Sequence, residues 1–537
     1  MRKIYFLIFW LIITGNKLNA SLVALIKTAN HSTLSSPWNR KASILSEDIY
    51  LKHFDFKNLS PFVKKIFDDF VEDELPNGST IKETLNEKAG TRDKIRLAQA
   101  LLLRDNKGDP ERAVEIIKWI LSLQNPDETS IDFGGWKGSV NSNSYDQNWR
   151  EFVGTDLVII YHKYKTRLPS DVVTELERCL IRTAKGDLIR NVNPDYNNIS
   201  IMSSFLLEYI GTAFNIPEIR NAGIQKAKEI YSNFLKYNTL CEYNSPTYYG
   251  VDFFGLALWR ELSFSQELKV LGKILEKALW LDLSEFYNAN LQNICGPYLR
   301  SYGMDMKKYN AITGVWIAAA VDNPEIATVP GKSGVTYEYS MIVSILNLGI
   351  SMPLQALSRL KEFDGPKFIS RVTSNYYEGD RLKKVTATIK KDWMMGGLWG
   401  NRKVSHILKT GTIHWKSTDE DISWLFIPGE GVTNVQVDEK QMKIYLADPQ
   451  AKIFSILVYS KNISSENFTD DLWKLLPMQL GIQSGLHRAE AEIVPQEEID
   501  NEGISTKDYP NIMKVVYKIP DNWNPADPLL IINPKYK

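Results

Sequence analysis

Residues 241–262 read CEYNSPTYYGVDFFGLALWREL, a polar and aromatic cluster that leads directly into an apolar run. The run has the composition of a buried helix. Pro246 and Gly250 interrupt regular structure, so we expect the tyrosines before the run to stand on a turn. The stretch therefore predicts a helix whose opening carries polar side chains.

Clusters of this kind recur along the chain about every fifty residues, and apolar helical segments separate them. That interval fits one helical hairpin with its loops. Stacked hairpins build a solenoid or close into a ring, in which the inner helices point their openings at a common cleft. We predict the closed form, an (α/α) toroid over residues 21–365. The clusters are NWREF (148–152), YNNIS (196–200), SPTYYGVD (245–252) and PYLRSYGMD (297–305).

The pattern changes after KEFDGPKF (361–368), where alternating runs such as KKVTATIKK, DISWLFIPG and KIFSILVYS begin. Period-two runs rich in Val, Ile, Thr and Trp, bounded by Gly, Asp and Pro, are typical of antiparallel strands. Residues 366–537 are thus predicted to form an antiparallel β-sheet domain, a sandwich. The predicted fold class is multidomain, α followed by β.

The first twenty residues have the pattern of a signal peptide. Met1, Arg2 and Lys3 are followed by the apolar run IYFLIFWLII, and Ala20 ends a cleavage site. We therefore expect residues 1–20 to be removed and the protein to be secreted. No later stretch of about 20 residues is free of charge, so a membrane anchor is not expected.

Charge and cysteine content narrow the classes of partner and cofactor. Lys and Arg number 64, as do Asp and Glu, which argues against nucleic acid as a partner. The three cysteines allow one disulfide and one thiol, or three thiols. Neither a CxxC nor an HExxH motif occurs, so zinc has no support. The cysteines are Cys179, Cys241 and Cys295, and glycosylation sequons start at Asn30, Asn58, Asn77, Asn198, Asn462 and Asn467.

A helical toroid joined to a sheet domain, with Asn, Tyr and Arg at the helix openings, resembles the toroidal polysaccharide lyases. That group contains alginate, chondroitin, hyaluronan and heparin lyases. The resemblance implies removal of the C5 proton of a uronic acid and expulsion of the sugar at C4. Such an enzyme must neutralise the carboxylate and must supply an acid and a base.

The resemblance assigns roles to particular residues. In these families an Asn opens one inner helix and a catalytic Tyr opens the next, and here Tyr248 follows Asn198 by fifty residues. Ile199 stands where a His often follows the Asn. His414, in GTIHWKS, is then the candidate base, since several such lyases take a His from the sheet domain. The alternatives are a helix cap for Asn198 and a half-buried strand residue for His414.

Other side chains of the clusters complete the predicted site. Tyr248 or Tyr249 is the candidate acid, and a neighbouring Arg would lower the pKa of a tyrosine. Arg150 and Arg300 can each hold a carboxylate through two hydrogen bonds, or can instead pair with Glu151 and Asp305. The expected sugar-binding residues, which could also be core side chains, are Tyr243, Asn244, Tyr302, Trp149 and Trp136.

Two rival functions stay open. A toroidal glycoside hydrolase would need two carboxylates, and the same clusters supply Asp146, Glu151, Asp195, Glu242 and Asp252. A non-catalytic carbohydrate-binding protein would use the same aromatic residues. We favour a lyase acting as a monomer on an acidic polysaccharide, without an organic cofactor but with room for a structural calcium ion. Rhamnose–glucuronate lyases of gum-arabic-type glycans are one candidate subgroup.

Overall fold

The computed structural model describes residues 48–308, 312–327, 339–373, 383–400, 405–417, 421–461, 463–486, 488–494 and 511–537. The predicted signal peptide (1–20) and the sequons at Asn30 and Asn462 lie outside the described residues. None of the helices in the described ranges is long and apolar enough to cross a membrane. Cys179, Cys241 and Cys295 are buried and form no disulfide with one another.

The N-terminal part is helical, apart from short strands. Strand β1 (Ile49–Lys52) pairs with β4 (Ile350–Pro353), and β2 (Tyr287–Asn288) pairs with β3 (Asn293–Ile294). The helices are α4 (Pro61–Glu74), α5 (Ile81–Thr84), α6 (Thr91–Arg104), α7 (Asp109–Ser122), α8 (Trp149–Tyr164), α9 (Ser170–Arg190), α10 (Asn197–Ala213), α11 (Pro217–Tyr237), α12 (Tyr249–Leu262), α13 (Gln266–Phe286), α14 (Ile312–Val321), α15 (Met341–Leu348) and α16 (Leu354–Lys361).

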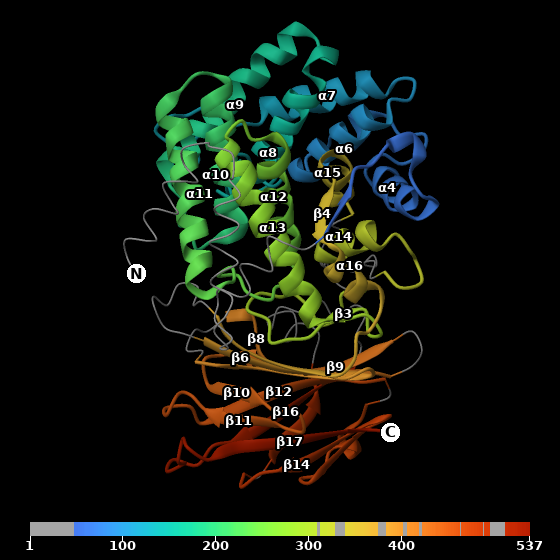
Figure 1. Cartoon of the computed structure of the whole chain (residues 1–537), viewed down its shortest axis with the longest axis vertical. Coiled ribbons are helices and arrows are strands. Elements are labelled where there is room, and N and C mark those ends of the chain that lie inside the picture. Colours follow the sequence, from blue (N-terminus) through green and yellow to red (C-terminus); the bar gives the residue numbers. More distant parts are fainter. Residues whose placement is uncertain are drawn as a thin grey trace, which may run out of the picture.

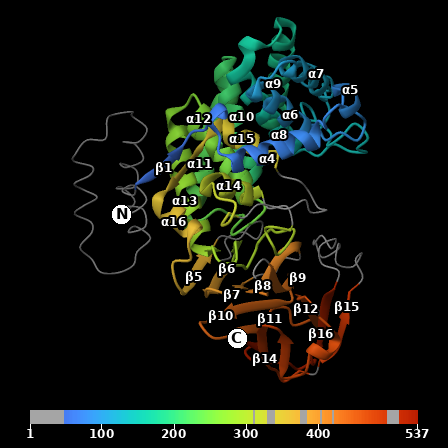
Figure 2. The same ribbon diagram turned by 90° about the vertical axis from the view of Figure 1, so that its right-hand side faces the viewer.

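These helices form a closed ring. Hairpins α6–α7, α8–α9, α10–α11 and α12–α13 follow one another, and the first helix of each packs against the first helix of the next. Helix α14 packs on α12, and α15 contacts both α12 and α6, which closes the circle. The predicted (α/α) toroid is confirmed. Figures 1 and 2 show it stacked on the sheets.

The inner helices run parallel, so their openings lie at one end. At this end, the Gly250 N–H of α12 donates to Thr313 Oγ1 of α14 (2.9 Å). At the other end, Arg260 of α12 donates to the carbonyl oxygen of Gly349, directly after α15 (3.1 Å). The end with the openings faces the sheets, because the loop after β3 bonds to β8 (Ser405–Lys416) through Tyr298.

Among the described residues, the C-terminal part contains antiparallel sheets of eight and five strands. The larger sheet has the order β15-β16-β12-β9-β8-β7-β6-β5 and the smaller one β10-β11-β17-β14-β13. Besides β8, the strands are β5 (Lys367–Thr373), β6 (Lys383–Ile389), β7 (Trp393–Trp399), β9 (Ile422–Gly429), β10 (Thr433–Val437), β11 (Met442–Leu446), β12 (Ile453–Tyr459), β13 (Leu472–Leu475), β14 (Met478–Gln483), β15 (Arg488–Ile493), β16 (Ile512–Lys518) and β17 (Pro528–Tyr536).

The larger sheet is covered on both faces, and β9 shows why. Its residues ISWLFIPG are all buried. Trp424 and Phe426 pack into the helical core, whereas Leu425 and Ile427 pack against the smaller sheet. A strand buried on both faces has an apolar run in place of a clean alternation. The smaller sheet closes the other face, so the predicted sandwich is confirmed.

Gly250 of α12 lies directly against the start of α14. A Cβ there would lie 2.5 Å from Ile312 Cγ2 and 2.6 Å from its carbonyl carbon. We predict that Gly250→Ala costs about 1–3 kcal/mol in the free energy of unfolding, because the backbone of α14 must shift. Urea denaturation measures this. Gly481→Ala is the control, since the nearest atom there is 3.7 Å away; equal losses in both variants would contradict the prediction.

Candidate functional site

Four side chains at the helix openings are half-buried and contact one another: Tyr196, Tyr248, Arg300 and Tyr302. We call them the tyrosine–arginine cluster. Tyr196 and Tyr248 directly precede α10 and α12, and the two others come from the loop after β3. The cluster therefore combines three of the four sequence clusters that recur about every fifty residues.

Tyr248 is the centre of this cluster. Its hydroxyl lies 2.8 Å from the hydroxyl of Tyr302, and the Arg300 guanidinium lies 3.8 Å from its ring centroid. Ser245 fixes the turn, because its hydroxyl accepts from the Tyr248 N–H (2.9 Å) and donates to the Arg300 carbonyl (2.6 Å). A phenol pair is thus held against a cation at the protein surface.

The environment keeps the Tyr248 phenol protonated. Burial raises its pKa above the ordinary value, and the hydrogen-bonded Tyr302 raises it further. Arg300 lowers the pKa, as the sequence predicts for a neighbouring cation, but burial is the larger effect. Tyr248 is therefore suited to donate a proton.

A buried carboxylate, that of Glu242, holds Arg300 from behind. One oxygen binds Arg300 Nη1, and the other accepts from the backbone N–H (2.7 Å) and the side-chain amide (2.6 Å) of Asn198. Burial lowers the Arg300 pKa, but Glu242, Tyr248 and Tyr196 together raise it by more, so the group stays cationic. The sequence suggests Glu242 only as a carboxylate of a hydrolase, although it stands six residues before Tyr248 in the same stretch.

Asn198 lies at the start of α10, as predicted, but it is buried and turned to Glu242. Its amide nitrogen, the atom to which a glycan would be attached, is the donor in that contact. Asn198 therefore acts on the cluster through Glu242. It does not line the surface next to Tyr248.

The other residues of the 241–252 stretch lie in the core. Tyr243 packs edge-on against Phe286. The Tyr249 hydroxyl accepts from the Asn244 N–H (2.7 Å) and donates to Asp282 (3.1 Å). Asn244, at φ 49°, donates to the carbonyls of the loop that leads to Arg300. These side chains shape the turn under Tyr248 without reaching the surface.

His414 is likewise buried, on β8. Its Nε2 lies 3.0 Å from the carbonyl oxygen of Met304, so the neutral ring donates to the loop that carries Arg300 and Tyr302. Burial lowers its pKa to about 4. His414 thus supports the loop that carries Arg300 and Tyr302, and it does not itself contact the tyrosine–arginine cluster.

This pKa predicts an acid-sensitive fold. An unfolded His binds a proton near pH 6.5, whereas folded His414 does so only near pH 4, so stability falls as pH falls through that window. The full loss is about 3 kcal/mol. His414→Gln should remove it in urea titrations at pH 7 and pH 4. The exposed His53→Gln should keep it, and an unchanged pH dependence in His414→Gln would contradict the assignment.

Arg150 and Trp136 lie away from the cluster. The Arg150 guanidinium donates to the carbonyl oxygens of Phe133 and Ile131 (both 3.1 Å), and Trp136 donates to Ile120 (2.9 Å). Both side chains are fully buried. They fix the loop before α8.

Trp149 is half-buried at the opening of α8, near the Arg92 guanidinium. The preceding Asn148 donates to the Tyr196 hydroxyl (3.3 Å), which joins this opening to the cluster. Glu151, the alternative partner proposed for Arg150, instead binds Arg190 (2.9 Å). Trp149, a predicted sugar-binding residue, therefore lies at the same end of the ring as the tyrosine–arginine cluster.

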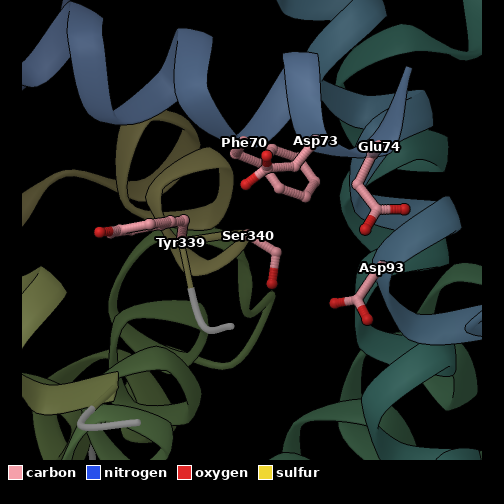
Figure 3. A pocket seen from close by; sticks show the side chains of 6 residues that line it. All are labelled: Phe70, Asp73, Glu74, Asp93, Tyr339 and Ser340. Carbon is pink, nitrogen blue, oxygen red and sulfur yellow. The ribbon is translucent and has the colours of Figure 1, made fainter. Parts of the chain in front are cut away.

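A cavity of about 290 Å³ lies elsewhere, between α4, α6 and the start of α15 (Figure 3). Its three carboxylates would repel a uronate, and Lys94 pairs with one of them, Glu74 (2.9 Å). In the described part of the chain, no group of three or more His, Cys, Asp or Glu side chains is arranged to hold a metal ion. The cavity is lined by Phe70, Asp73, Glu74, Asp93, Tyr339 and Ser340.

Comparison with known proteins identifies one matching family model and solved structures that resemble this chain distantly. The family model described as "Domain of unknown function (DUF8769)" matches residues 66–343, just over half of the chain. No curated protein matches. The solved structures similar to this chain include two lyases, which belong to the group that the sequence resembles.

The first is a Paenibacillus xanthan lyase, at 10% identity and a TM-score of 0.42. The match covers 90% of this chain but 58% of that one, so this chain spans less than two thirds of its length. The second is a Streptomyces coelicolor A3 chondroitin AC lyase in complex with chondroitin sulphate, at 9% identity and a TM-score of 0.40. That match covers 90% of this chain and 80% of the other.

Proposed function

We propose that this chain, which belongs to the family described as a domain of unknown function (DUF8769), is a secreted polysaccharide lyase. It would cleave a uronic-acid-containing glycan by β-elimination, as a monomer and without a cofactor. The observation that carries the proposal is the half-buried Tyr248–Tyr302 hydroxyl pair beside Arg300. A structural calcium ion stays a prediction.

Arg300 is proposed to bind the uronate carboxylate. The C5 proton is weakly acidic because the carbanion would stand next to a negative carboxylate, so a cation there lowers the barrier. A guanidinium has five N–H donors, and the structure shows Nη1 donating to Glu242. The charge on Glu242 orients the group, and Asn198 holds Glu242 in place.

The two phenols are proposed to divide the proton transfers. Tyr248 stays protonated and would donate to the C4 oxygen as the C4–O bond breaks. The Tyr302 oxygen would take the C5 proton while the C5–H electron pair forms the C4–C5 double bond, and Tyr302 would pass its own hydroxyl proton to Tyr248 over 2.8 Å. Both phenols then carry a proton again.

This division replaces some of the roles predicted from the sequence. His414, Tyr249 and Arg150 are fully buried, so we assign them the role of supporting the loops and not a part in the proton transfers. Tyr243, Asn244 and Trp136 are buried too, so we do not propose that they bind the sugar. Trp149 and Tyr302 remain candidates for contact with the glycan.

A substrate panel tests the proposal. The purified protein is incubated with uronate-containing glycans, among them chondroitin, alginate, xanthan and rhamnose-capped glucuronate chains. We expect new ultraviolet absorbance from the unsaturated uronate product on one of them. New reducing ends without that absorbance would indicate a hydrolase, and binding without either signal would indicate a non-catalytic carbohydrate-binding protein.

A further inference from the structure

Asp252 is a second buried carboxylate near the cluster. It lies in the first turn of α12, one helical turn after Tyr248, and its side chain is fully buried. Neither of its oxygens has a hydrogen-bond partner among the described residues. A carboxylate buried in the ionised form normally accepts two or more hydrogen bonds, so this environment requires an explanation.

The charges around Asp252 are few. The Glu242 carboxylate and the Arg300 guanidinium act on it, together with Tyr249 on its own helix. Helix α14, which packs on α12, has no titratable side chain, and the first turn of α10 has no charged one. Asp282 of α13 is bound by the Tyr249 hydroxyl and pairs with Arg371 of β5. The cation that acts on the Asp252 carboxylate is Arg300, and it already pairs with Glu242.

One guanidinium cannot balance two buried carboxylates. An ionised Asp252 would have lost its water without gaining a donor, next to a carboxylate of the same sign. Glu242 accepts three hydrogen bonds and so keeps the negative charge. We infer that Asp252 holds a proton at neutral pH, so that Glu242 is the single negative charge behind Arg300 and the site can accept an anionic glycan.

The electrostatics agree with this assignment. Burial, and next the Glu242 carboxylate, raise the pKa of Asp252 well above its ordinary value, while Arg300 opposes them. With Asp252 neutral, the charges of Glu242 and Arg300 sum to zero; an ionised Asp252 would leave a net charge of −1 facing the substrate carboxylate. Asp252 thus acts on the substrate indirectly, through the charge balance around Arg300. Its effect on substrate rests on the proposed function, but its protonation does not.

Infrared spectroscopy tests the protonation without any substrate. The wild-type difference spectrum against Asp252→Asn at neutral pH should show the carbonyl stretch of a protonated carboxyl group, shifted in D₂O and lost as the pH rises. Absence of this band would overturn the inference. Asp252→Leu, which has similar volume and no polar atoms, gives a second difference spectrum if the Asn variant does not fold.

Stability against pH is an independent measure. Above about pH 4 an unfolded Asp has released its proton, whereas folded Asp252 still holds one. Wild-type stability therefore falls relative to Asp252→Asn as pH rises from about 4 toward the folded pKa. A stability difference that does not change with pH would contradict the inference.

Kinetics on the glycan found in the panel test the functional part. At neutral pH, Asp252→Asn should change kcat and KM by no more than about twofold. At higher pH, it should lack the rise in KM that the wild type shows when Asp252 ionises. A hundredfold loss of kcat in a folded Asp252→Asn would show that an ionised carboxylate is needed, and would overturn the inference. An infrared band together with no lyase activity would contradict the proposed function alone.

Discussion

Tyr248→Phe should lower kcat by about 10²–10⁴-fold, the range for loss of a positioned general acid. The substitution removes one oxygen and keeps the ring that stacks with Arg300 at 3.8 Å, so KM should change little. The matched control is Tyr445→Phe, a half-exposed tyrosine on β11 in the sheet domain. The measurement is the initial rate of product absorbance at saturating substrate.

The partner hydroxyl gives this prediction a second arm. Tyr302→Phe should cost as much as Tyr248→Phe, and the double variant should cost little more than either, because the hydroxyls act as a pair. Full activity in Tyr248→Phe would show that the proton comes from another group. Independent, multiplicative losses would show that the two phenols do not share a proton.

Much of the fold could be predicted from the sequence because it depends on periodicity. The recurrence of polar clusters about every fifty residues predicts hairpins, and their inner helices do meet in one ring. The alternating runs after residue 366 predict strands. The burial of β9 on both faces can be predicted from its apolar run. Which helices cover the face with Trp424 and Phe426 cannot, because this depends on how distant segments pack.

The site was predicted less completely, and neighbouring residues show why. Tyr248 and Tyr249 are equivalent in sequence, but successive helical residues point about 100° apart, so one reaches the surface and the other the core. Arg150 and Arg300 stand in similar clusters; the first binds loop carbonyls and the second stacks on Tyr248. Such differences depend on contacts between residues far apart in the chain.

Glu242→Ala should be the most destabilising of the proposed substitutions. The substitution removes the buried carboxylate, which binds Arg300 and accepts from both donors of Asn198, and it leaves the half-buried guanidinium without this partner. Breaking a buried ion pair in this way costs about 3–5 kcal/mol in the free energy of unfolding. Urea denaturation measures the loss, and lyase activity should fall because Arg300 is no longer oriented.

The matched control is Glu175→Ala, whose carboxylate pairs with Arg178 and Arg182 and is 39% exposed. Exposed pairs contribute at most about 1 kcal/mol, so the two alanine variants should differ by several-fold in cost. Glu242→Gln separates charge from shape, since it retains an oxygen for the donors of Asn198. If Glu242→Ala proved as stable as Glu175→Ala, Arg300 would not depend on Glu242, and the Glu242 carboxylate would not be the charge that balances it.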